Sequence, residues 1–247
     1  MDRVDIIGVS ISATNMDECI RVVGEDIDII RGNYICAANV HTTVMASEDS
    51  EYKEIQNKSF MTLPDGKPLS IVGRKKGFKD MDRVTGPEFM EKILELSEDK
   101  GWSHYFYGNT SKNLNMLIDT VKNRYPNLKI KGYESSVFRP LTDAEKITLI
   151  DKINSVNPDF VWVGLGAPLQ EEFCAELCNK TNSIWVGVGG AFNVIAGVIP
   201  RAPEWMQKCC LEWFYRFLKE PKRLFKRYFI TNTKFIYRVI NEKNYEE

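Results

Sequence analysis

The sequence lacks the signals of a secreted or membrane-spanning protein. No apolar run approaches the roughly 20 residues needed to cross a bilayer, and Val4–Ala13 is too short and too polar for a signal peptide. The chain begins Met1-Asp2-Arg3-Val4, without a cluster of basic residues. We therefore expect a cytoplasmic protein.

Histidine and paired cysteine are scarce as well. Two histidines and six cysteines occur in 247 residues, and no two cysteines have the C-x-x-C spacing of a zinc site. The cysteines should be reduced and buried as small apolar side chains.

Two common nucleotide-binding motifs are also missing. No G-x-x-x-x-G-K-[ST] motif for the phosphates of ATP is present. A dinucleotide site is not indicated either, because Leu169 stands at the third glycine position after Gly164 and Gly166. The next predicted strand, Ile184–Val188, ends without an acidic residue for a ribose. We expect no cofactor and no metal.

What the sequence does contain is a regular alternation of short apolar runs and helical patterns over residues 1–200. The predicted strands are Asp5–Ile11, Tyr34–Ala38, Phe60–Thr62, His104–Tyr107, Lys129–Tyr133, Phe160–Leu165 and Ile184–Val188. The predicted helices are Asn15–Ile29, Thr42–Gln56, Pro87–Lys100, Ser111–Tyr125, Thr142–Asn154 and Leu169–Asn179. This alternation predicts an α/β domain of the Rossmann-like type, with a mostly parallel sheet covered by helices on both faces. Ligands of such sheets bind at the carboxyl ends of the strands.

Three of the loops that follow strands are rich in glycine. Gly108 follows one strand, Gly164 and Gly166 close a second, and Gly189 and Gly190 follow a third. Glycine lets backbone N–H groups approach a phosphate closely, and the next helix offers its positive end. Any one of these loops is equally well explained as a tight turn. Three of them in one sheet favour a nucleotide or a sugar nucleotide.

A fourth loop contains a carboxylate. Pro64-Asp65-Gly66 would present Asp65 at the same edge of the sheet, where it could accept the proton of a hydroxyl group as a general base. By itself Pro-Asp-Gly is most often a plain turn, so this assignment depends on further evidence.

Residues 201–247 differ from the rest of the chain in charge. They contain 11 Lys and Arg against 6 Asp and Glu, whereas residues 1–200 contain 22 against 28. Their apolar residues recur at helical spacing between the basic ones: Phe214, Phe217, Leu218, Pro221, Leu224, Phe225, Tyr228 and Phe229, then Phe235, Ile236, Val239 and Ile240. Such a basic amphipathic helix suits an anionic membrane surface. The alternative is a terminal helix that packs on the core with its charges in solvent.

An ordered set of motifs over nearly the whole chain resembles the WecG/TagA/CpsF family of bacterial glycosyltransferases. The matching blocks are Asn39, Pro64-Asp65-Gly66, Arg83-Val84-Thr85-Gly86, Gly164-Leu165-Gly166-Ala167-Pro168 with Gln170-Glu171, Gly187-Val188-Gly189-Gly190-Ala191-Phe192, Arg201-Ala202-Pro203-Glu204-Trp205-Met206-Gln207, Leu211-Glu212-Trp213, Tyr215-Arg216, Glu220-Pro221 and Arg227-Tyr228.

The resemblance implies an inverting, metal-independent transfer of a sugar from a UDP-sugar to a polyprenyl-diphosphate-linked sugar at the cytoplasmic face of the membrane. The sugar implied first is N-acetylmannosamine, the acceptor is lipid-linked N-acetylglucosamine, and the product serves a teichoic acid or another surface polysaccharide. UDP-glucose or the uronic acid of UDP-N-acetylmannosamine is the alternative donor. Residues 201–247 would form an appendage that docks on the membrane and closes the active site.

The resemblance also assigns roles to residues. Asp65 would be the general base, Asn39 and Gln170 would position sugar groups, and Arg83 would face the diphosphate. Further binding residues would be Thr43, Gly66, Gly108, Gly164, Gly166, Gly189 and Gly190, with Arg216, Arg223 and Arg227 closing over the diphosphate.

Some features leave alternatives open. The family often has Thr where this chain has Ala37, so either this enzyme does without that hydroxyl or Thr42 or Thr43 substitutes for it. His41 is a reserve base, with a merely structural role as the alternative. Two D-x-D patterns, Asp26-Ile27-Asp28 and Asp80-Met81-Asp82, resemble metal sites but offer few oxygen ligands. A non-catalytic protein that binds UDP-sugars at the membrane is the main rival hypothesis. Nucleic-acid binding is not expected, and a homodimer in solution is compatible with exposed aromatics.

Overall fold

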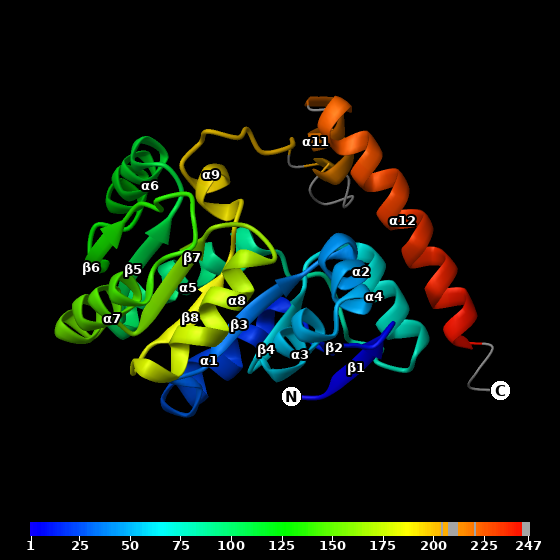
Figure 1. Cartoon of the computed structure of the whole chain (residues 1–247), viewed down its shortest axis with the longest axis horizontal. Helices are drawn as coiled ribbons and strands as arrows, with labels where there is room; N and C mark the ends of the chain where they lie inside the picture. The colour runs from blue at the N-terminus through cyan, green and yellow to red at the C-terminus, as the bar shows by residue number, and fades with distance from the viewer. Residues whose placement is uncertain (204, 207–211, 220, 244–247) are drawn as a thin grey trace.

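A six-stranded parallel sheet forms the centre of the molecule (Figure 1). The computed structural model describes residues 1–203, 205–206, 212–219 and 221–243. In spatial order the strands are β4 (Met61–Pro64), β3 (Tyr34–Ala38), β8 (Ile184–Gly187), β7 (Phe160–Gly164), β5 (Ser103–Gly108) and β6 (Lys129–Glu134). The chain runs outward from β3 to β4 and then crosses to the other side, so the direction of winding changes between β3 and β8. In such sheets a crevice opens at that point, beyond the carboxyl ends of the strands.

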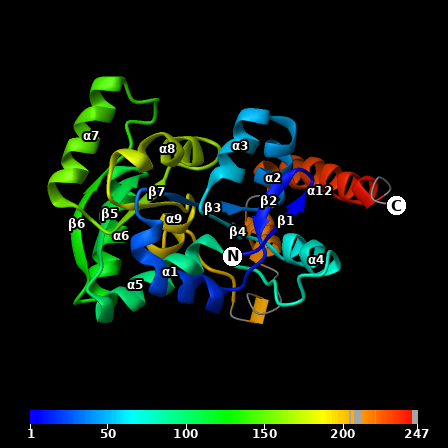
Figure 2. The ribbon, with the colours of Figure 1, turned by 90° about the horizontal axis from the view of Figure 1, so that it is seen from below.

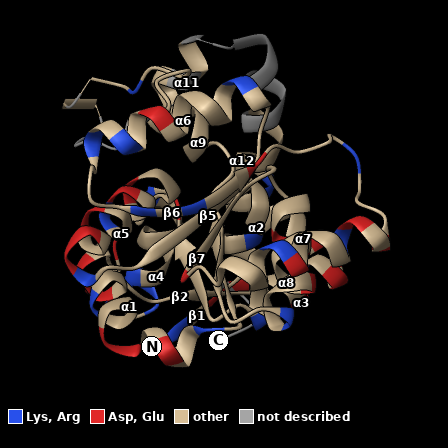
Figure 3. Ribbon diagram, turned by 90° about the vertical axis from the view of Figure 1, so that its left-hand side faces the viewer, with Lys and Arg blue, Asp and Glu red and all other residues tan. Residues whose placement is uncertain are grey.

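Helices cover both faces of this sheet, as predicted. One face packs against α1 (Met16–Ile30), α5 (Gly86–Lys100), α6 (Ser111–Arg124) and α9 (Ala191–Ile195). The other face packs against α7 (Asp143–Val156), α8 (Leu169–Leu177) and the short 3-10 helix Cys178–Lys180. Acidic and basic residues lie along the outer helices, as Figure 3 shows for α1, α5 and α7.

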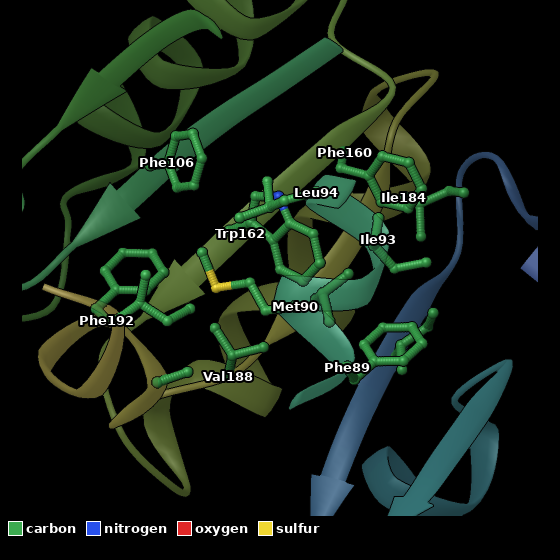
Figure 4. Packing of buried hydrophobic residues seen from close by; sticks show 14 of the residues in the cluster. Phe89, Met90, Ile93, Leu94, Phe106, Phe160, Trp162, Ile184, Val188 and Phe192 are labelled. Carbon is green, nitrogen blue, oxygen red and sulfur yellow. The ribbon is translucent and has the colours of Figure 1, made fainter. Parts of the chain in front are cut away.

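The strands contribute to both faces because neighbouring side chains point in opposite directions. Trp162 of β7 is fully buried beside α5 (Figure 4), whereas Val161 and Val163 pack on the opposite face. The indole Nε1 of Trp162 donates a hydrogen bond to His104 Nδ1 at 3.0 Å. Burial lowers the pKa of the His104 imidazole to about 3, so this histidine is a neutral core residue.

For four of the cysteines, the prediction that they are reduced and buried is confirmed. Cys19, Cys36, Cys174 and Cys178 are buried free thiols. Cys209 and Cys210 lie outside the described residues.

The predicted strand Asp5–Ile11 is wrong. Residues 3–12 form a hairpin of β1 (Arg3–Ile6) and β2 (Val9–Ser12), which pair antiparallel in a separate two-stranded sheet. Ile7 and Gly8 turn the chain, with φ of 51° and 83°. Only Gly8 takes such angles readily, so the pattern of β-branched residues concealed the turn.

The predicted helix Thr42–Gln56 is two helices, α2 (Val40–Glu48) and α3 (Ser50–Lys58). Asp49 separates them with extended backbone, and its carboxylate caps α3 by accepting from the N–H groups of Glu51 and Tyr52. The prediction also missed α4 (Lys67–Lys75), which begins beside the turn residues Gly66 and Pro68. The capping box at Thr142 is confirmed.

The C-terminal segment forms α11 (Glu212–Lys219) and α12 (Pro221–Lys243), with Pro221 at the first helical position of α12. The end of α12 lies against α2 and the N-terminal hairpin (Figures 1 and 2). Phe235 is 4% exposed and packs with Val44, Leu69 and other residues of a third apolar cluster. Phe235 therefore belongs to this cluster, and the partly buried Val239 packs against it.

Ion pairs hold this part of α12 in place. Lys234 and Arg238 each lie 2.7 Å from the Glu48 carboxylate at the end of α2. Glu242 pairs with Lys76 at 3.0 Å and accepts the backbone N–H of Ile7 at 3.0 Å. Residues 231–242 are thus bound to the residue 1–200 core on two sides.

Candidate active site

The loops predicted to bind substrate line one edge of the sheet. Asp65, Asn39 and Gly189 follow β4, β3 and β8, and Gly164 and Gly108 are the last residues of β7 and β5. These five strands are neighbours in that order. Four strand spacings of roughly 4.8 Å separate the first from the last, about 19 Å in all. A sugar nucleotide and an acceptor sugar can be accommodated along such an edge.

Asn39 begins α2 and caps it. Its Oδ1 accepts from the N–H groups of His41 and Thr42, while Thr42 Oγ1 accepts from Asn39 N at 2.8 Å. Thr43 is fully buried, and its hydroxyl donates to the Asn39 carbonyl at 2.8 Å. Thr43 therefore supports Asn39 from behind. Among the described residues, no hydrogen bond engages Asn39 Nδ2, which is thus available to a ligand.

Asp65 and Arg83 are brought to the same edge by backbone hydrogen bonds. Asp65 N donates to the Ala38 carbonyl at 2.7 Å, beside Asn39, and Val84 N donates to the Pro64 carbonyl at 3.0 Å. The Asp65 side chain is half-buried. Three segments far apart in the sequence therefore bring the backbones of residues 39, 65 and 83 together at the ends of β3 and β4.

The Arg83 side chain forms an ion pair with α5. Its Nη2 lies 2.9 Å from Glu88 Oε1, and Glu88 also accepts from the Thr85 hydroxyl at the start of α5. The Nη2 side of the guanidinium therefore binds Glu88. Arg216, Arg223 and Arg227, the other predicted diphosphate contacts, have side chains that lie outside the described residues.

Ala37 lies where a larger side chain would meet the first turn of α5. Ala37 is buried beneath the first turn of α5, where a Cβ added to Gly86 would lie 3.8 Å from the Ala37 Cβ. The hydroxyls of Thr42 and Thr43 both contact the Asn39 backbone instead of reaching this position.

The three residues of the acidic pattern Asp80-Met81-Asp82 have different surroundings. Asp82 Oδ1 lies 2.7 Å from Lys67 Nζ and 3.6 Å from Arg74 Nη1. Burial alone would raise the pKa of the Asp82 carboxyl, but the hydrogen bonds from Lys67 and from the Arg83 N–H lower it below its usual value. Met81 is buried in the core, and Asp80 is exposed. Lys67 and Arg74 therefore already balance the charge of Asp82. That the reaction needs no metal stays a prediction.

The glycine loops after β5 and β7 approach each other closely. A Cβ on Gly108 would lie 2.8 Å from the backbone of Gly164, so no other residue fits there without a shift of the chain. The next residue, Asn109, donates through Nδ2 to Asn193 Oδ1 at 2.7 Å, and Asn113 donates to the same oxygen at 3.0 Å. This asparagine cluster could not be predicted from the sequence, because 84 residues separate Asn109 from Asn193.

Gln170 is buried beneath the edge, only 5% exposed. Its Oε1 accepts the N–H of Gly166 at 3.0 Å, and its Nε2 donates to Glu171 Oε1 at 2.8 Å. A Cβ on Gly189 would lie 2.8 Å from Gln170 Oε1. The Gln170 amide thus supports the loops after β7 and β8 from below.

Glu171 is completely buried, and burial raises the pKa of its carboxyl to about 7. The folded protein keeps the proton up to about pH 7, whereas the unfolded chain releases it near pH 4.5. Stability contributed by the protonated carboxyl is therefore full below pH 4.5 and is lost as the pH rises toward 7. Glu171→Gln removes this titration. As the pH rises across that window, the free energy of unfolding of this variant should increase relative to that of wild type, by at most about 1.4 kcal/mol per pH unit.

Urea unfolding of both proteins at several pH values between about 4.5 and 8 measures this difference. A constant difference across the window would show that Glu171 does not titrate there.

A cavity of about 480 Å³ lies elsewhere, between α3 and α8 near the amino end of β3. Asn33, Glu51 and Asn179 line it, and none of the predicted site residues whose side chains the structure describes does.

Comparison with known proteins identifies the family. A sequence profile of the Glycosyl transferase WecG/TagA/CpsF family matches residues 4–247. The chain belongs to this family. The predicted resemblance is thereby confirmed, and with it the prediction that the protein is a glycosyltransferase.

Two relatives are both named N-acetylglucosaminyldiphosphoundecaprenol N-acetyl-beta-D-mannosaminyltransferase. The protein of Bacillus subtilis (strain 168) is 30% identical over 193 residues, which cover 78% of this chain and 73% of the relative. The protein of Staphylococcus aureus (strain MW2) is 28% identical over 229 residues, which cover 90% and 87%.

The structure also bears on membrane contact. In the described part of the chain, no helix combines the length and the apolar character needed to cross a bilayer.

Proposed function

We propose that this family member transfers N-acetylmannosamine from a UDP-sugar to undecaprenyl-diphosphate-linked N-acetylglucosamine. The relatives' name supports the acceptor and the sugar. The single structural observation that carries the proposal is the placement of Asp65 beside Asn39 and Arg83, at the edge that the glycine loops share.

In the proposed mechanism Asp65 removes the proton from the acceptor hydroxyl. That oxygen attacks the anomeric carbon from the face opposite the nucleotide and forms the new glycosidic bond. The bond from the anomeric carbon to the diphosphate breaks, and UDP leaves with the electron pair. Backbone N–H groups of the glycine loops and Arg83 stabilise the negative charge that develops on UDP.

A donor panel tests this function. UDP release is measured with UDP-N-acetylmannosamine, its uronic acid and UDP-glucose, with and without a short-chain polyprenyl-diphosphate N-acetylglucosamine acceptor. Acceptor-dependent release from the first donor supports the proposal. Release from another donor would reassign the sugar, and UDP binding without any release would favour the non-catalytic rival.

We further propose that the C-terminal helices dock the enzyme on the membrane that holds its acceptor. Phe229, Ile236 and Ile240 are exposed and recur on one side of α12, at steps of seven and four residues. Tyr237 and, on α11, Leu218 are exposed as well. Because Lys234 and Arg238 pair with Glu48, apolar contact rather than these two cations would supply the binding.

Replacing two of these side chains should weaken binding to vesicles. The double variant Ile236→Ser and Tyr237→Ser removes apolar groups that are 57% and 67% exposed, and we expect about tenfold lower affinity for vesicles containing anionic lipid. Cosedimentation measures it. Ile29→Ser on α1, where the side chain is 69% exposed, is the control. Equal affinity of the double variant and wild type would refute docking through this surface.

A further inference from the structure

Two hydrogen-bonded groups of buried polar side chains lie between α3 and the Gly166 loop. Gln56 Nε2 donates to the Tyr52 hydroxyl at 2.8 Å, Gln170 Nε2 donates to Glu171 Oε1 at 2.8 Å, and Gly166 N donates to Gln170 Oε1 at 3.0 Å. All four side chains are at least nine-tenths buried. Tyr52 and Glu171 face each other across the gap between α3 and α8, where burial and the Glu171 charge raise the pKa of the Tyr52 hydroxyl.

The Gln170 amide has little freedom to move. A Cβ on Gly187 would lie 3.2 Å from Gln170 Cγ, and one on Gly189 would lie 2.8 Å from Oε1. Gly166, which Oε1 holds from the other side, has a φ of 88°, a conformation that favours glycine. A displaced Gln170 would therefore disturb the loops after both β7 and β8.

Glu171 determines which way this amide points. Glu171 Oε1 accepts from the Gln170 NH₂ group, which leaves the Gln170 oxygen to accept the Gly166 N–H. The carbonyl oxygen of a protonated carboxyl can accept this hydrogen bond just as a carboxylate oxygen does. An apolar residue of similar size would leave the NH₂ group without its acceptor. Such an unsatisfied buried donor is costly, and the amide would reorient or shift to avoid it.

We propose that Glu171 is a positioning residue of the transferase: through Gln170 it holds the two glycine loops in the geometry that binds the diphosphate of the donor. Glu171 itself is fully buried, so it would act through Gln170. This inference rests on the proposed function, because it assigns the donor to these loops.

Three variants test it. Glu171→Leu should raise the donor KM and the UDP Kd about tenfold, because Gln170 loses its acceptor, while the acceptor KM changes less than about twofold. Glu171→Gln keeps an oxygen opposite Gln170 and should restore donor binding to within about threefold of wild type. Glu172→Leu changes the next residue, which is exposed, and should leave both constants unchanged.

The outcomes separate the possible roles. A merely structural Glu171 would lower the Tm of the leucine variant without a selective change in donor KM, and this result overturns the proposal. An equal loss of donor affinity in the Leu and Gln variants overturns it as well. If the leucine variant does not fold, Glu171→Met takes its place, since its unbranched side chain is close to glutamate in shape and has no oxygen to accept from Gln170. A selective rise in its donor KM supports the proposal, and an unchanged donor KM overturns it.

Failure of the proposed function would look different. In that case wild type itself would release no UDP from UDP-N-acetylmannosamine in the presence of the acceptor, whatever residue stands at position 171.

Discussion

Asp65→Asn is expected to reduce the rate of sugar transfer by about 10²–10⁴-fold while UDP affinity stays within about twofold of wild type. Asparagine has nearly the same shape, and the backbone N–H of residue 65 would still bond to the Ala38 carbonyl, so the loop should keep its position. The amide cannot take a proton from the acceptor hydroxyl. Single-turnover kinetics measure the transfer step, and UDP titration measures binding.

A nearby aspartate provides the control. Asp80 is exposed and lies in the loop before Arg83, so Asp80→Asn should leave the rate within about twofold of wild type. Should Asp80→Asn or EDTA abolish transfer instead, the D-x-D pattern would hold a metal and the metal-independent mechanism would be wrong. Near-normal turnover in Asp65→Asn would remove Asp65 from the role of base.

Phe235→Ala is expected to reduce the free energy of unfolding by about 3–5 kcal/mol. Phe235 packs in the apolar cluster shared by the hairpin, α2, α4 and α12, and truncation leaves a cavity among these elements. Tyr237, two residues further along α12, is 67% exposed. Tyr237→Ala should change stability by less than about 0.5 kcal/mol. Urea unfolding followed by tryptophan fluorescence compares the two variants.

This pair of variants also decides how the appendage is built. If Phe235→Ala unfolds no more easily than Tyr237→Ala, then α12 is not part of the core and the whole segment 201–247 is one detachable unit. If the expected difference is found, removing the chain from residue 201 would expose the apolar cluster. Membrane docking is then better tested with surface substitutions than with a truncated protein.

The sheet could largely be predicted because its strands are short apolar runs separated by amphipathic helices. The predicted runs at 34–38, 104–107 and 184–188 agree with β3, β5 and β8 to within two residues. The errors fall where a local signal conflicts with the pattern. Ile7 adopts a left-handed conformation that β-branched residues avoid, and Asp49 interrupts what reads as one helix.

The candidate site could be predicted only in part. Motif order indicated Asn39, Asp65, Arg83 and Gln170, and topology then placed the loops that carry them on neighbouring strand ends. The sequence offered no reason to expect that Gln170 is buried under those loops, that Thr43 is buried behind Asn39, or that Glu48 would neutralise Lys234. Each of these facts depends on a partner at a distant position in the chain.

Composition, periodicity and motif order by themselves determined the α/β class, the glycosyltransferase family and the charge difference between the core and its C-terminal segment. These properties are local or additive along the chain. Only the tertiary structure decided which face of α12 is covered, which carboxylates are neutralised and which buried carboxyl orients Gln170. Those outcomes depend on contacts such as Ile7 with Glu242, made by residues that are 235 positions apart and meet only when the chain has folded.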